Sequence, residues 1–185
     1  MSLGHGIAKA AGRALSSVHA GADKLAAARL VNEATPRLTV TSPSFQDQAP
    51  LPQRFTTDGA GEAPELRWTA PPTPAGAFVL LCEDPDAPKT EPFVHWLVYD
   101  IAGDARRLDA RTAEQARQGK NSTMSVGFTP AAPPPGHGLH HYHFQLFALD
   151  APLGLDDRAG RGAVLDAMKD HVVAFGELVG TYERQ

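Results

Sequence analysis

Prolines and glycines divide much of this sequence into short apolar runs, and this spacing limits what the chain can fold into. The 185 residues include 16 prolines and 17 glycines, most of them between residues 43 and 138. Proline lacks a backbone donor and breaks helix interiors, and both residues favour turns. The pattern therefore predicts short strands joined by structured loops rather than long helices.

The apolar runs between these breakers have the length and composition of strands. Residues 77–83 (AFVLLCE) lie between a Pro/Gly-rich turn and the sequence DPDAP, which is typical of a buried strand. Further strands are expected at residues 37–41, 93–101, 140–149 and 177–183. Residues 42–64 and 119–139 are predicted to be long loops, because proline and glycine recur in both.

Helical spacing is confined to a few parts of the sequence. Residues 112–118 form a predicted short helix with Thr112 as its N-cap candidate. Residues 161–174 repeat apolar side chains at helical intervals. Because strands outnumber helices, we expect a mainly β fold, an antiparallel β-sandwich in residues 37–185 with one or two helices packed against it.

The first 36 residues are predicted to form a helical N-terminal extension. Residues 3–32 are rich in alanine and contain two helical pieces, interrupted near Gly21 and ending before Pro36. Residues 1–34 carry four basic and two acidic side chains, a net charge of +2. Such a segment could lie on a membrane surface or act in targeting. We favour packing on its own domain or on a second subunit of a homodimer, because its apolar face is weak.

Composition argues against several classes of protein. The net charge of −4 does not indicate a nucleic-acid partner. No apolar stretch is long enough to cross a bilayer, so a membrane-embedded protein is not expected. The N-terminus lacks the continuous apolar core of a secretory signal, and the single cysteine, Cys82, cannot form an intramolecular disulfide. These features predict a cytoplasmic protein.

Two carboxylates lie in a rigid segment after the first buried strand. Pro85 and Pro88 restrict the residues that precede them, so DPDAP is expected to form a fixed turn. Binding residues often lie on loops that a rigid scaffold holds in place. Asp84 and Asp86 are therefore candidate ligand-binding residues, although an acidic turn alone is more typical of solvent-exposed loops.

His95 makes a binding role for these aspartates more plausible. It lies in a bulky apolar strand, where a buried imidazole needs hydrogen-bond partners for both ring nitrogens. Asp84 and Asp86 precede it by eleven and nine residues, across a connection that could return the chain as a neighbouring strand. A carboxylate partner would raise the pKa of His95 and favour the imidazolium near neutrality.

The strand predicted at residues 140–149 adds two more candidates. Alternate residues of a strand share a face, so His140 and Tyr142 lie at the polar end of a face that is otherwise apolar and points into a core. His141 and His143 are expected on the other face, half exposed. The preceding loop, PPPGHG, would form a stiff pocket wall with free backbone N–H groups. Its candidate residues are Pro134 and Gly136.

Together these segments resemble the phosphatidylethanolamine-binding protein (PEBP) family, in particular its bacterial members described as Raf kinase inhibitor-like. The matching stretches are LLCEDPDAPKTEPFVHWLVYDI, PPPGHGLHHYHFQLFALD and the terminal GELVGTYER, within residues 38–185. The bacterial branch is indicated by the HWLV form and the TYER ending. Residues 1–36 lie outside the family pattern.

The resemblance implies a Greek-key-like β-sandwich with a small pocket for anions such as phosphate, acetate or a phospholipid head group. It implies that this pocket is lined by Asp84, Asp86, His95, His140 and Tyr142. It also implies cis-prolyl bonds near the first motif. His141 stands where the family usually has arginine, and Ala132 and Phe128 replace a common glycine and tyrosine at the rim.

The leading functional hypothesis is a binding module with no catalytic residue, cofactor or metal. In it, His95 and His140 donate N–H groups to a phosphate or carboxylate, while Asp84 and Asp86 hold the imidazoles or meet a cationic amine. The family further implies regulation of a protein target, a kinase or a protease. The alternative is a hydrolase of phosphoesters, metal-dependent or acid–base, that uses the same pocket. Cys82 is interpreted as a buried structural thiol.

Overall fold

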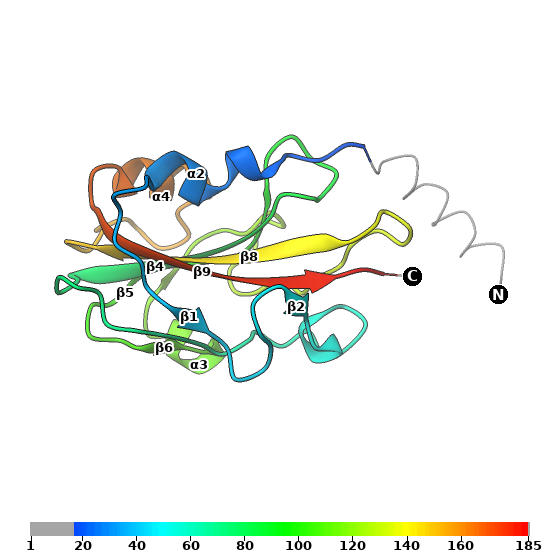
Figure 1. Cartoon of the computed structure of the whole chain (residues 1–185), viewed down its shortest axis with the longest axis horizontal. Coiled ribbons are helices and arrows are strands. Elements are labelled where there is room, and N and C mark those ends of the chain that lie inside the picture. Colours follow the sequence, from blue (N-terminus) through cyan, green and yellow to red (C-terminus); the bar gives the residue numbers. More distant parts are fainter. Residues whose placement is uncertain (1–16, 185) are drawn as a thin grey trace.

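A six-stranded sheet and a three-stranded sheet form the two layers of the protein (Figure 1), in a computed structural model that describes residues 17–184. The larger sheet contains, in spatial order, β2 (Ala49–Pro50), β9 (Val172–Tyr182), β8 (His140–Leu149), β4 (Ala77–Asp84), β5 (Phe93–Ala102) and β7 (Arg117–Gln118). The smaller sheet contains β1 (Val40–Thr41), β3 (Leu66–Trp68) and β6 (Arg107–Leu108). The prediction of a mainly β fold with two sheets and few short helices is confirmed.

Strand β4 lies near the centre of the larger sheet because nearly all of its side chains are apolar. All eight of its residues are buried, as expected for a strand that is covered on both faces. It pairs antiparallel with β5 on one side and β8 on the other, so that Cys82 lies opposite both Trp96 and Phe144. The three strongest predicted strands are confirmed to within one residue at each end.

The two faces of β8 pack into two different cores. Tyr142, Phe144 and Leu146 belong to the core between the sheets. Phe147 and Leu149 belong to a second core on the outer face, which is covered by helices α2 (Ala26–Leu30) and α4 (Arg161–Met168). The alternation predicted for this strand is therefore confirmed, and it sends the first residue of β8, His140, toward the inter-sheet side.

The N-terminal segment packs on this outer face. The one-turn helix η1 (Ala22–Lys24) leads into α2, whose Ala26 is 0% exposed. The backbone N–H groups of Ala26 and Ala27 donate to the side chains of Glu83 and Gln145, each at 2.8 Å. The described part of the predicted extension therefore packs on its own domain, while the first 16 residues lie outside the described residues.

The short helix predicted at residues 112–118 is wrong in position. Helix α3 spans Ala110–Ala113, and its N-cap is Asp109 rather than Thr112. The two residues form a capping box, because the Asp109 carboxylate accepts the Thr112 N–H while the Thr112 hydroxyl accepts the Asp109 N–H, each at 2.8 Å. The chain then leaves the helix to pair with β5 as β7, whose residue Arg117 lies opposite Tyr99.

The helix predicted at residues 161–174 ends earlier than its spacing indicates. Helix α4 stops at Met168, Asp170 adopts a positive φ of 65°, and β9 begins at Val172, five residues before the predicted start. Pairing with β8 along its full length overrides the helical pattern here. The strand predicted at residues 37–41 is also shorter than expected, because only Val40–Thr41 form β1.

Some of the predicted loop regions contain short regular elements. Residues 42–64 include β2 and the one-turn helix η2 (Gln53–Phe55). β2 is the edge strand of the larger sheet and runs parallel to β9. Within residues 17–184, no helix combines the length and the apolar character needed to cross a membrane.

Candidate functional site

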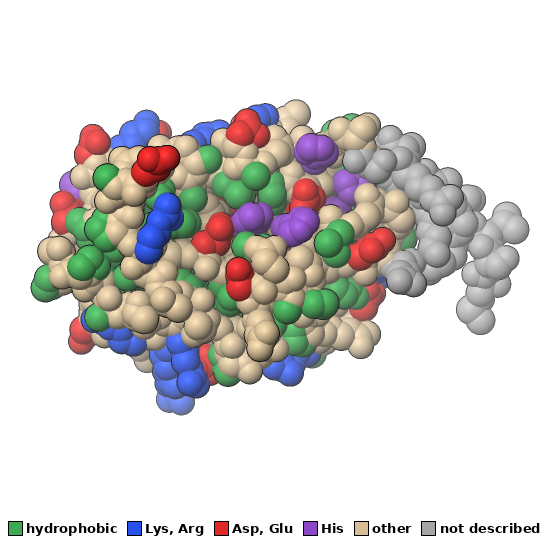
Figure 2. Space-filling view, in the orientation of Figure 1, with side chains coloured by type: hydrophobic (Ala, Val, Ile, Leu, Met, Phe, Trp, Pro, Cys, Tyr) green, Lys and Arg blue, Asp and Glu red, His purple; other side chains and the backbone are tan. Residues whose placement is uncertain are grey.

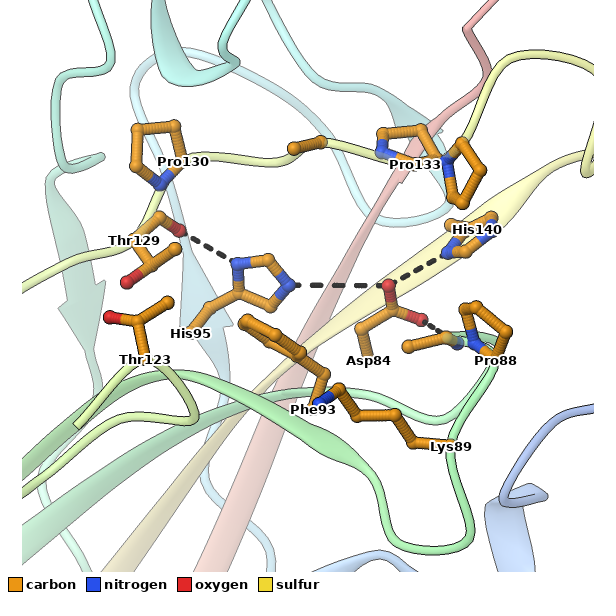
Figure 3. Close-up of a pocket in the computed structure, with 13 residues that line it drawn as sticks. Asp84, Pro88, Lys89, Phe93, His95, Thr123, Thr129, Pro130, Pro133 and His140 are labelled. Atoms are coloured by element: carbon orange, nitrogen blue, oxygen red, sulfur yellow. Dashed lines mark hydrogen bonds and ion pairs between the residues drawn. The ribbon is translucent and has the colours of Figure 1, made fainter. Parts of the chain in front are cut away.

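A cavity of about 290 Å³ lies at one end of the larger sheet, where β4 ends and its antiparallel neighbours β5 and β8 begin (Figure 3). Its buried end is formed by Asp84, His95 and His140, which are 3%, 4% and 1% exposed. These are the last residue of β4, the third of β5 and the first of β8. The rest of the lining is Ala87, Pro88, Lys89, Phe93, Thr123, Thr129, Pro130, Ala132, Pro133 and Pro134.

The carboxylate of Asp84 connects the elements of the site. Its Oδ1 atom accepts the backbone N–H groups of Asp86 at 2.8 Å and Ala87 at 3.0 Å, which holds the DPDAP turn against the end of β4. Its Oδ2 atom lies 2.8 Å from Nδ1 of His140. An ionised carboxylate is only an acceptor, so the hydrogen in this bond belongs to His140.

His140 is hydrogen-bonded at both ring nitrogens inside the protein. Besides the bond to Asp84, its Nε2 atom lies 2.8 Å from Nδ1 of His137. His137 is buried, at 8% exposed, and was not among the predicted site residues. His140 therefore orients Asp84 and has no nitrogen left to donate to a ligand, so the predicted direct donation from His140 is wrong.

His95 presents a different nitrogen to the cavity. Its Nδ1 atom lies 2.7 Å from the carbonyl oxygen of Thr129, and its Nε2 atom lies 4.0 Å from Oδ2 of Asp84. Burial lowers the pKa of His95, and the Thr129 carbonyl and the Asp84 carboxylate only partly oppose this shift. The predicted rise in the His95 pKa is therefore wrong, because desolvation outweighs the carboxylate.

Asp86 does not line the cavity. Its Oδ2 atom accepts the backbone N–H of His141 and also bonds to Nδ1 of the His141 ring, each at 2.8 Å. His141 and His143 are half-buried on the outer face, as their strand parity predicted. His143 bonds to Glu177 at 3.0 Å rather than to the site.

Tyr142 lies behind His95 rather than in the cavity lining. The two rings meet edge to face with their centroids 5.0 Å apart. The phenol is 2% exposed, and burial raises its pKa far above the ordinary value, so it stays protonated. Among the described residues its hydroxyl has no hydrogen-bond partner. Tyr142 thus fixes the position of the His95 ring.

The proline-rich loop supplies a wall, as predicted, but not through all the expected residues. Pro133 and Pro134 line the cavity, whereas Gly136 does not. Gly136 adopts a positive φ of 78°, which lets the chain turn back so that the His137 N–H donates to the Pro134 carbonyl at 3.0 Å. The histidine in the sequence PPPGHG is the feature that could have identified His137 as a residue of the site.

The cavity mouth and rim are mostly apolar. Phe93 lines one side, and the exposed ammonium of Lys89 lies 5.5 Å from the centre of its ring. Ala132 also lines the cavity, but Phe128 packs edge to face on Trp96 instead. The described residues contain no cis peptide bond, so the expectation of cis-prolyl bonds near the first motif is wrong.

The described residues do not form a metal-binding cluster. No three side chains of His, Cys, Asp or Glu within residues 17–184 are arranged to hold one metal ion. Cys82, which adjoins the site in sequence, is 0% exposed, and burial raises the pKa of its thiol well above the ordinary value.

Comparison with known proteins decides the family. The family model for phosphatidylethanolamine-binding protein matches residues 41–183.

The chain belongs to the phosphatidylethanolamine-binding protein family.

Similarity to individual PEBP relatives agrees with this assignment. The UPF0098 protein of Methanothermobacter thermautotrophicus is 35% identical over 147 residues, covering 76% of this chain and 95% of that protein. A crystal structure of the PEBP homolog CT736 from Chlamydia trachomatis matches with a TM-score of 0.75 and 32% identity, covering 82% of this chain and 100% of that one. The structure of E. coli YbcL, described as a member of the mammalian PEBP family, gives a TM-score of 0.72 at 27% identity, covering 80% and 99%. The predicted bacterial branch corresponds to the bacterial and archaeal UPF0098 group.

Proposed function

We propose that the cavity binds a small anion, a phosphate or a phosphorylated head group. The observation that carries this proposal is the convergence of two polar groups, His95 Nε2 and the Asp84 carboxylate, 4.0 Å apart at the buried end of a cavity with largely apolar walls. A few convergent polar groups in an apolar cleft are typical of small-ligand sites. The PEBP family model, named for a phosphorylated head group, supports the same ligand class.

The size of the cavity favours a small ligand. A volume of about 290 Å³ is at the lower limit of the cavities that hold drug-sized molecules. A phosphate or phosphoethanolamine group fits this space, whereas the acyl chains of a phospholipid would have to remain outside. The proposed ligand is therefore the head group itself, free or attached to a larger molecule.

Charge at the mouth supports binding of an anion. Lys89 is exposed and lines the cavity, so its ammonium can approach a phosphate that enters. A charge-assisted hydrogen bond of this kind is stronger than a neutral one. Asp84, at the other end, is held by His140 and two backbone N–H groups, which fix its position before a ligand enters.

NMR titration with phosphoethanolamine tests the proposal. We expect shifts in the resonances of His95, Lys89 and Thr129 at mildly acidic pH, with weaker binding at alkaline pH as the phosphate monoester loses its last proton. Absence of binding at both pH values, or shifts confined to residues outside the cavity, would contradict the proposal.

A protein target is a second proposal, favoured by apolar side chains beside the cavity. Met124 and Leu139 are 66% and 50% exposed, and each adjoins a residue of the cavity lining. Exposed apolar groups near a ligand site are suited to a protein contact. The unmodified protein should inhibit its kinase or protease target. The double variant Met124→Ser, Leu139→Ser should lose this inhibition while keeping its affinity for phosphate.

Light scattering of the same samples would reveal a homodimer.

The hydrolase alternative has less support. Cys82 has the buried, protonated thiol of a structural residue, and Thr123 donates its hydroxyl to Asn121 at 2.7 Å. Neither side chain is activated by a neighbouring base. A screen with general esterase and phosphatase substrates, with and without added divalent metals, would detect such an activity.

A further inference from the structure

We infer that the cavity selects a phosphate that still carries a proton over anions that have none, such as sulfate or a phosphate diester. This inference rests on the proposed function and specifies the ligand class of the same site. It depends on which atoms at the buried end can donate a hydrogen and which can only accept one.

His95 carries its ring hydrogen on Nδ1 and faces the cavity with Nε2. Its Nδ1 atom lies 2.7 Å from the carbonyl oxygen of Thr129, and a carbonyl oxygen only accepts. The hydrogen therefore resides on Nδ1. In a neutral imidazole the other nitrogen is then an acceptor, so Nε2 presents a lone pair to the cavity.

Burial favours the neutral form of His95. The groups that face it are the Asp84 carboxylate from β4, the His140 ring and the Tyr142 phenol from β8, and the Thr129 carbonyl. Burial lowers the pKa of His95 despite the carboxylate. The ring is 4% exposed, so its neutral form is the one that meets a ligand near neutral pH.

Asp84 provides the second acceptor at the buried end of the cavity. Its carboxylate accepts three hydrogen bonds, from His140 and from the backbone of Asp86 and Ala87, and its Oδ2 atom also faces His95 Nε2 at 4.0 Å. Figure 3 shows the His95 and Asp84 side chains pointing toward one another. This distance is too long for a direct hydrogen bond. Two acceptors therefore face each other across a gap.

His140 cannot supply the missing donor. One of its nitrogens is bonded to Asp84 and the other to His137, each at 2.8 Å. An oxygen of sulfate, or of a diester, that lay between His95 and Asp84 would thus meet a lone pair from each of them. A P–OH group would donate to Asp84 or His95, and its other oxygens could face Lys89 at the mouth.

The energetic consequence is large because the gap is buried. A site built to accept a hydrogen bond from a hydroxyl rejects an analogue that lacks the hydroxyl, since its polar groups are then left unpaired. We expect at least about tenfold weaker binding of sulfate than of inorganic phosphate near neutral pH.

The two phosphates should also differ in their pH dependence. A phosphate monoester loses its last proton with a pKa of about 6, whereas inorganic phosphate retains one across the neutral range. Phosphoethanolamine should therefore bind with uptake of one proton above this pKa, with affinity falling about tenfold per pH unit, while inorganic phosphate should lose much less.

Isothermal titration calorimetry of the full chain tests this. Inorganic phosphate, sulfate, phosphoethanolamine, dimethyl phosphate and ethanolamine are titrated at mildly acidic and mildly alkaline pH, each in two buffers of different ionisation enthalpy so that proton uptake is counted. We expect inorganic phosphate to bind at both values and phosphoethanolamine mainly at the lower one. Sulfate and dimethyl phosphate should bind weakly at both.

Each opposite outcome has a separate meaning. Sulfate that binds as tightly as phosphate at alkaline pH would overturn this inference and leave the proposed function standing. Binding of none of the phosphates at either pH would overturn the proposed function itself. Ethanolamine that binds as tightly as phosphoethanolamine would also overturn the inference, because the ammonium would then be the donor at the gap.

A substitution provides a second test. Asp84→Asn replaces one acceptor oxygen with an N–H donor of nearly the same shape, so the preference for phosphate over sulfate should fall about threefold or more, even though Nε2 of His95 still accepts. His143→Gln is the matched control, since His143 on β8 also bonds to a carboxylate, that of Glu177 on β9, but lies outside the cavity. If Asp84→Asn is folded by circular dichroism and prefers phosphate as strongly as the unmodified protein does, the acceptor role assigned to Asp84 is wrong. The ligand panel on the unmodified protein decides the question if the variant does not fold.

Discussion

Nδ1 of His140 lies 2.8 Å from Oδ2 of Asp84, although the two residues are 56 positions apart in the chain. The antiparallel pairing of β4 with β8 brings these strand ends together. Since His137 bonds to the second nitrogen of His140, the three side chains form one hydrogen-bonded chain that ends at the cavity. His140 is thus a positioning residue for Asp84.

Replacing His140 by glutamine should weaken phosphate binding by about tenfold, the equivalent of one lost hydrogen bond to a charged group. The reason is that Asp84 would lose the side-chain donor that fixes its Oδ2 atom. Calorimetric titration with inorganic phosphate measures the change, with His143→Gln as the control on the opposite face of β8. Equal affinities of the two variants would contradict the positioning role.

The His95 environment makes stability depend on pH. Burial lowers the pKa of His95 in the folded protein, so the unfolded chain binds the proton more readily. The contribution of neutral His95 is therefore fully present above the unfolded pKa of about 6.5 and decreases as the pH falls from there toward the folded pKa. Urea unfolding between neutral and mildly acidic pH should show a slope reduced in His95→Gln by up to about 1.4 kcal/mol per pH unit. Identical slopes in the two proteins would show that folding does not lower the pKa of His95.

A buried ion pair holds the N-terminal segment to the domain. Glu83 is 0% exposed and bonds to Arg161 as well as to Gln145 and the Ala26 N–H. Arg161→Met should lower the free energy of unfolding by about 3 kcal/mol, because the carboxylate would remain buried without its cation.

The matched control for Arg161 is Lys169→Met, which breaks the exposed pair with Asp166. It should cost less than about 1 kcal/mol. Both values come from urea unfolding curves at neutral pH. Equal losses in the two variants would mean that burial does not determine the contribution of the Glu83 pair.

Cys82 should be unreactive in the folded protein. It is 0% exposed, and burial keeps the thiol protonated by raising its pKa. Titration with a thiol-specific disulfide reagent should detect no free thiol in the native state and one in urea. Rapid modification of the native protein would contradict this and would revive Cys82 as a nucleophile.

The strands that build the site could be predicted from local sequence, whereas several other elements could not. The apolar runs of β4, β5 and β8 show no helical spacing that would compete with a strand, and flanking prolines and glycines indicate where they end. Residues 161–174 have helical spacing throughout, but pairing with β8 converts their last part into β9. The two-residue strands lack any periodicity, because they exist only through their partners.

The sequence by itself predicted that Asp84, His95 and His140 belong to one site, from the short spacing between Asp84 and His95, the strand parity of His140 and the motifs that resemble the PEBP family. Only the tertiary structure decided what each group can do. Hydrogen bonds from Thr129 and His137 occupy particular ring nitrogens, and Asp86 turns to His141. Those partners come from loops whose path depends on packing rather than on periodicity. The apolar strand indicated that His95 is buried, but only the structure showed that desolvation outweighs the Asp84 carboxylate, which reverses the expected direction of the His95 pKa.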